Sequence, residues 1–200
     1  MVFDELDGNG WELLKPQSSH WSEGFAVPRL LRQSDAVVQT CNLKTHRFGG
    51  HFTLSLKNSV GLAAKRLPGR SYDYMNELHG SARQREMIAE INLAYTPAFV
   101  VLDGIEAFTR GGPDQGTVVQ SEVMLAATDR VALDAVGVAV LRLWGTTPEV
   151  SAGPIFRQAQ IARAVELGLG VGRPDLIELV TGDEASRAYA ARVRGVLDAG

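Results

Sequence analysis

The sequence predicts an α/β protein, a mostly parallel sheet covered by helices, in a single domain over residues 1–200. Three short runs rich in β-branched and aliphatic residues predict strands at 36–41, 98–102 and 117–127. Segments with helical spacing of apolar residues lie between and after them. Strands that alternate with helices are typical of βα units, which form largely parallel sheets. The composition, 45% hydrophobic and 22% charged, is that of an ordinary globular protein.

The first part of the chain is polar and has little periodicity. Residues 1–24 contain Gly8, Gly10 and Pro16 and are expected to form a loop-rich opening segment with one short strand at most. Pro28 then opens a short helical piece over residues 29–33. The apolar run at 36–41 follows and predicts a buried strand.

Helices are predicted at 54–65 and 81–95. Pro68-Gly69 stops the first, and Gly61 within it is a poor helix former. Ser81 is a suitable N-cap for the second, and Pro97 ends it just before the strand at 98–102.

The second half continues the alternation of strands and helices. Residues 111–116 are rich in glycine and lack the Lys-Ser/Thr ending of a phosphate loop, so a turn is the favoured interpretation. After the strand at 117–127, Asp129 can cap a helix over 131–143. A further helix is expected at 155–167, and the tail over 173–200 is expected to be helical.

Charge and cysteine content exclude several classes of function. A net charge of −3 without a long basic run gives no attraction to nucleic acid or to an anionic membrane. Cys41 is the single cysteine, so neither an internal disulfide nor a cysteine-ligated iron–sulfur cluster can form within the chain. The acidic N-terminus and the absence of a long apolar run predict neither a signal peptide nor a membrane span, so a cytoplasmic location is expected.

Charged residues follow the predicted strands. In open α/β sheets ligands bind beyond the carboxyl ends of the strands. The strand at 36–41 leads to Lys44 and His46, the strand at 98–102 leads to Asp103 and Gly104, and the strand at 117–127 leads to Asp129. These side chains are therefore expected to meet at one rim.

Lys44, His46 and Lys57 are the candidate catalytic residues. Lys44 and His46 are two residues apart, so they point to the same side of an extended segment. Lys57 is expected in the first turns of the next helix, beyond Gly49-Gly50. Two lysines beside a helix N-terminus suit a small anionic ligand. A lysine whose pKa is lowered by cationic neighbours could also act as a base or Schiff-base nucleophile, and His46 could exchange a proton. The alternative is an ordinary solvated surface.

The sequence also contains possible metal ligands. His46, His51 and His79 are possible ligands, together with Asp103 and Asp129, but no fixed ligand spacing supports them.

Several motifs together resemble the family called domain of unknown function 362. They are Leu43-Lys44-Thr45-His46, Thr53 to Gly61 (T-L-S-L-K-N-S-V-G), Asp103-Gly104, Gly112 to Gly116 (G-P-D-Q-G) and Thr128 to Ala135 (T-D-R-V-A-L-D-A). The resemblance covers about residues 25–172. It implies a cofactor- or ligand-binding part for Asn58, Asp103, Gly104 and Asp129.

The resemblance also bears on partners. Members of that family often occur beside or fused to ferredoxin-type clusters, which implies a separate iron–sulfur protein as a partner here. The chain is also shorter at its N-terminus than the family pattern, so a second α/β chain could complete the sheet. Three hypotheses follow: an enzyme for a small anionic metabolite, a non-catalytic module that binds a ligand or metal, and a structural subunit.

Overall fold

The computed structural model describes residues 3–200 and contains six strands and eight α-helices in that range. The strands are β1 (Trp11–Leu14), β2 (Phe25–Pro28), β3 (Val38–His46), β4 (His51–Thr53), β5 (Phe99–Gly111) and β6 (Gly116–Ala127). The helices are α1 (Leu30–Gln33), α2 (Ser55–Asn58), α3 (Tyr74–Gly80), α4 (Gln84–Ile91), α5 (Arg130–Leu143), α6 (Pro148–Ser151), α7 (Ala159–Glu166) and α8 (Glu184–Ala199). The chain is therefore an α/β protein.

The main sheet is mixed, which corrects the expectation of a mostly parallel one. Its strand order is β4-β3-β5-β6, and only β3 and β5 run parallel. The turn over 111–116 closes a hairpin between β5 and β6, because so short a connection can join only antiparallel neighbours. The parallel pair is joined instead through α2, α3 and α4.

The predicted strands exist but extend further. The run at 36–41 continues to His46, and the run at 98–102 continues to Gly111. The extensions contain more polar residues than the apolar runs, yet Leu43, Ala107 and Thr109 within them are buried, so the apolar runs alone mark only part of each strand. β4 was not foreseen, because it has only three residues.

The predicted helices agree with the observed ones in the second half of the chain and differ from them in the first half. α5 matches the expected 131–143 closely, and α7 occupies most of 155–167. The expected helix at 54–65 is one α-turn followed by a 3₁₀ turn (Ser59–Leu62), consistent with the glycine at position 61. The expected helix at 81–95 begins three residues later as α4, and α3 precedes it.

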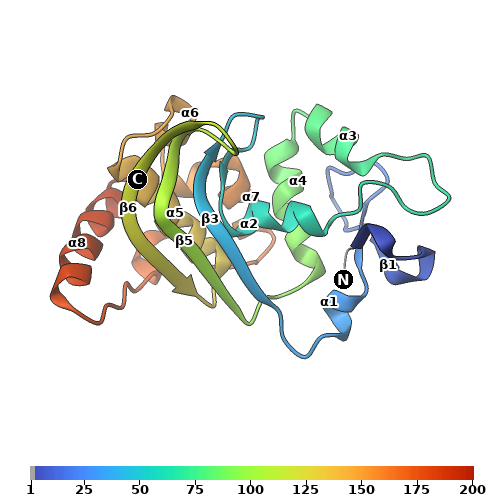
Figure 1. Cartoon of the computed structure of the whole chain (residues 1–200), viewed down its shortest axis with the longest axis horizontal. Helices are drawn as coiled ribbons and strands as arrows, with labels where there is room; N and C mark the ends of the chain where they lie inside the picture. Colours follow the sequence, from blue (N-terminus) through green and yellow to red (C-terminus); the bar gives the residue numbers. More distant parts are fainter. Residues whose placement is uncertain (1–2) are drawn as a thin grey trace.

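One face of the sheet is packed and the other is uncovered. Leu43, Leu102 and Ala107 are buried against α5, which contributes Val138 and its neighbours to the same core. Figure 1 looks onto the opposite face, with α5 behind the strands and α8 beside β6. On that opposite face of β3 lie the even-numbered side chains from Val38 to His46, because successive strand residues alternate between faces.

A second apolar cluster holds the N-terminal segment against α3 and α4. β1 and β2 pair as an antiparallel hairpin, so the opening segment has two strands rather than one. Trp11, Trp21 and Phe25 are buried with Leu78 and Ile88. Within residues 3–200, none of the helices has the length and apolar character to cross a bilayer.

Candidate functional site

The β3–β4 hairpin presents Lys44 and His46 side by side. Both lie on the uncovered face of β3, two positions apart and partly buried. His46 is the last residue of the strand, directly before the turn that leads to Gly50 and β4. The two side chains point to the same face, as expected, because the alternation of strand residues between the two faces of the sheet continues to the end of β3.

Lys57 reaches the same place from α2. This helix begins at Ser55, and the buried carboxylate of Asp134 on α5 fixes its start. Asp134 accepts hydrogen bonds from the backbone N–H of Ser55 (2.8 Å) and of Leu56 (3.1 Å) and from the Ser55 hydroxyl (2.5 Å). Because these N–H groups have no partner within the helix, the carboxylate both caps α2 and sets the direction in which Lys57 leaves it.

The Lys57 side chain and the His46 ring converge on Gly50. A Cβ atom at Gly50 would lie 2.5 Å from Lys57 Cε and 3.3 Å from His46 Nδ1. The absence of a side chain at this position is therefore what lets the lysine lie across the hairpin backbone. We call Lys44, His46 and Lys57 the cationic cluster.

Burial and like charges lower the pKa values in the cationic cluster. The pKa of His46 falls to about 4, first through burial and then through the charges of Lys57 and Lys44. The pKa of Lys57 falls to about 8, again through burial first and Lys44 second. None of the ion pairs between described residues involves a member of the cluster. His46 Nδ1 is buried and has no hydrogen-bond partner among those residues.

A cavity of about 660 Å³ opens beside His46, between the hairpin and the corner that joins α3 to α4. Phe48 and Gly49 line it on the hairpin side, and His79 and Arg85 line it on the helical side. Arg85 donates a hydrogen bond to the backbone oxygen of Gly49 (2.9 Å), which ties the two walls together. Sequence reasoning missed Arg85, since nothing in its neighbourhood along the chain marks it.

Asp103 lies on the sheet face of the cationic cluster, whereas Gly104 and Asn58 take part in the packing of the fold. Asp103 lies opposite Asn42 on the same face as Lys44, in mid-strand rather than past a strand end. Gly104 packs inward, where a Cβ would press on Val123 and Leu43 at 3.0–3.1 Å. Asn58 donates to the backbone oxygen of Thr40 (2.8 Å) and so binds α2 to the edge of β3.

Asp129 corrects the expectation of a single rim. β6 runs antiparallel to β5, so its carboxyl end, Ala127, lies beside Val100, whereas Lys44 lies beside Phe108 at the other end of β5. Both carboxylate oxygens of Asp129 are also occupied: Oδ1 accepts from the N–H groups of Val131 and Ala132, and Oδ2 from that of Val171. Asp129 is an N-cap of α5, far from the cationic cluster.

The candidate metal ligands do not form a group. His51 lies opposite His46 in the strand register, but the charges that act on it are those of Arg85 and Glu149. Burial and Arg85 lower its pKa. His79 lines the same cavity as His46, yet within residues 3–200 no set of three or more His, Cys, Asp or Glu side chains is arranged to hold a metal ion.

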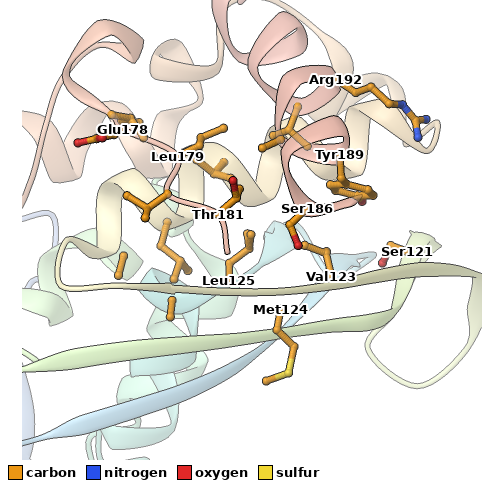
Figure 2. Close-up of a pocket in the computed structure, with 18 of the residues that line it drawn as sticks. Ser121, Val123, Met124, Leu125, Glu178, Leu179, Thr181, Ser186, Tyr189 and Arg192 are labelled. Carbon is orange, nitrogen blue, oxygen red and sulfur yellow. The ribbon is translucent and has the colours of Figure 1, made fainter. Parts of the chain in front are cut away.

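A further cavity of about 680 Å³ lies between β6 and α8. Figure 2 shows its walls: Val123 and Leu125 point from β6 toward α8 and Tyr189, while Met124 points away. The walls are mainly aliphatic, and its charged residues are Glu122, Glu178 and Arg192. This cavity contains no member of the cationic cluster.

Comparison with protein families gives a match over residues 1–139 to the model described as domain of unknown function (DUF362). The chain belongs to this family. The match includes β1 to β6 and ends within α5, so it begins and ends earlier than the 25–172 that the motifs indicate. It includes all three residues of the cationic cluster. Neither the curated proteins nor the solved structures gave a match.

Proposed function

We propose that this member of the family binds a small anionic ligand at the cationic cluster, and that His46 and Lys57 can exchange a proton with it. The observation that carries the proposal is the convergence of three basic side chains with no carboxylate within 4.0 Å among the described residues. Like charges brought together and partly buried raise the free energy of the empty site, and a bound anion relieves that cost.

The protonation states support proton transfer. At neutral pH His46, with a pKa of about 4, is uncharged and can accept a proton. Lys57, with a pKa of about 8, is mostly charged and can donate one. General acid–base catalysis works best when the pKa lies near the operating pH. Lys57 meets this condition in the free site, and His46 approaches it when a bound anion raises the pKa of its ring.

The test is a thermal-shift titration with orthophosphate and sulfate. Lys57→Met keeps the aliphatic stem on Gly50 and removes the charge, so we expect the affinity to fall roughly 10- to 150-fold, the worth of a charge-assisted hydrogen bond of about 1.5–3 kcal/mol. The matched control is Lys65→Met, because Lys65 is exposed and belongs to no ion pair among the described residues. Equal shifts for both variants would make the cluster an ordinary solvated surface.

A second candidate is a non-catalytic subunit that binds a ligand or metal beside a partner chain in the cytoplasm. The observation in its favour is the uncovered sheet face, on which Val38, Phe99 and Met124 are exposed. The partner would be a second α/β chain or a separate iron–sulfur protein. Native mass spectrometry with metal analysis of the purified chain tests it: a strictly monomeric, metal-free protein whose His46 variant loses turnover but not binding would contradict it.

A further inference from the structure

The cavity beside His46 adds two further basic residues, Arg85 and His79, to those of the cationic cluster. Its walls contain the rings of His46, Phe48 and His79 and the guanidinium of Arg85. Lys44 and Lys57 are not among the residues that line the cavity, although their charges act on His46, so His46 is the residue that the cluster and the cavity share. Basic groups therefore occur both in the cluster and in the cavity wall, and His46 belongs to both.

Arg85 and His79, which line the cavity, have N–H or ring nitrogen atoms available to a ligand. The Nδ1 atom of His79 lies 2.7 Å from the backbone oxygen of Met75, so Nδ1 carries a proton, and Nε2 can donate to an anion when it is protonated as well. Arg85 uses Nη1 for Gly49, and its other N–H groups take part in no hydrogen bond among the described residues. The neighbouring carboxylate of Glu86 is paired with Arg83 at 3.0 Å.

The size of the cavity also suits a ligand larger than one inorganic anion. About 660 Å³ is within the range of small-molecule sites and far exceeds what one inorganic anion fills. Phe48 and Ala82 give its wall an apolar part, and Ser81 and Gln84 supply uncharged polar groups. None of its lining residues is an acid.

We propose that the ligand is a bis-anion, with one anionic group at Lys44 and Lys57, a short body that passes His46, and a second anionic group at Arg85 and His79. This inference rests on the proposed function and specifies the ligand class of the same site. Two phosphoryl groups, or a phosphoryl and a carboxylate group, on one small molecule meet the requirement. His46 then faces the middle of the ligand rather than one end, which is where a proton acceptor would act on the body.

The experiment uses a series of alkane-α,ω-bisphosphonates with one to five carbons as rulers and methylphosphonate as the single anion, measured by isothermal titration calorimetry. We expect one member of the series to bind at least about 10-fold more tightly than methylphosphonate. Arg85→Met and, separately, His79→Gln should reduce that advantage. His79→Gln is included because Arg85 also holds Gly49. Arg187→Met, an exposed change on α8, is the control for general electrostatics.

The outcomes separate the two proposals. If methylphosphonate binds and requires Lys57, but no bisphosphonate gains affinity or the gain survives both Arg85→Met and His79→Gln, the bis-anion inference is overturned and the proposed function stands. If neither probe binds, or binding ignores Lys57→Met, the proposed function falls and this inference with it.

Discussion

His46 and Lys57 lie against the same glycine, although they come from different elements. The Lys57 stem and the His46 ring both approach Gly50, where a Cβ would lie 2.5 Å from Lys57 Cε and 3.3 Å from His46 Nδ1. The hairpin positions the ring and α2 positions the lysine, so the arrangement depends on both elements at once.

The first prediction follows from that contact. Gly50→Ala should displace the end of the Lys57 side chain and weaken sulfate binding, with little loss of stability, because the atom it meets is the far end of a flexible side chain. Gly61→Ala is the control, since a Cβ at that position meets nothing within 4 Å. Thermal melts with and without sulfate measure both effects. Unchanged sulfate binding in Gly50→Ala would contradict the placement of Lys57.

The second prediction concerns stability and pH. The pKa of Lys57 is about 8 in the folded chain, below the ordinary 10.5, so the folded state binds this proton less tightly than the unfolded state. The resulting cost is fully present below pH 8 and disappears as the pH rises to 10.5. In sulfate-free buffer Lys57→Met should therefore stabilise the protein at pH 7 by on the order of 1–3 kcal/mol, with the gain shrinking above pH 8.

Urea unfolding of wild type and Lys57→Met across this pH range measures the difference. A gain that is the same at every pH would show that the lysine titrates normally. Lys65→Met is the control for the loss of one positive charge, because Lys65 is exposed.

The third prediction concerns Asp134. Burial raises its pKa to about 7, against the opposing effect of the hydrogen bonds from Ser55 and Leu56. A carboxyl group with a raised pKa contributes stability that is fully present below pH 4 and is lost as the pH rises through 7. At pH 5 Asp134→Asn replaces a protonated carboxyl group by a neutral amide of nearly the same shape, so it should cost no more than about 1 kcal/mol. Toward pH 8 the variant should become the more stable protein, because the wild type has lost the stability of its protonated carboxyl group.

Chemical denaturation at a series of pH values checks it. Asp198→Asn on α8 is the control, since Asp198 is an exposed partner of Arg194 at 3.4 Å. Parallel stability curves for wild type and Asp134→Asn would rule out a titrating carboxyl at the start of α2.

The fourth prediction separates binding from proton transfer at His46. Sulfate binding should raise the pKa of the ring from about 4, so near pH 5 the wild type should take up part of a proton on binding. Calorimetry in two buffers of different ionisation enthalpy measures this uptake. His46→Gln should abolish the uptake and reduce affinity only modestly. A large loss of affinity with uptake intact would instead assign the proton to another group.

The sequence predicted the cationic cluster better than the rest of the site, for a physical reason. Lys44 and His46 are close along one strand, so alternation alone puts them together. Lys57 follows within one short hairpin and one helical turn. The expected position of Asp129 was wrong because the direction of β6 depends on the turn at 111–116. A turn this short makes β6 antiparallel to β5, so the two strands end at opposite edges of the sheet.

The rest of the site depends on contacts that are distant in sequence. Arg85 meets Gly49 across 36 residues, and Asp134 meets Ser55 across 79. No local pattern marks such pairs. The elements that the sequence predicted best are long, as in α5 and β6, and the elements that it predicted least well are short, as in β4 and α2.

The most direct test of the anion site is the pKa of His46 measured by NMR, with and without saturating sulfate. We expect a His46 pKa of about 4 in the free protein, raised by at least about one unit when sulfate is bound. The ring resonances of His20, whose ring contacts Glu90 at 2.7 Å away from the cluster, serve as the internal control for sulfate addition at constant pH. A His46 pKa that is the same with and without sulfate would contradict the account.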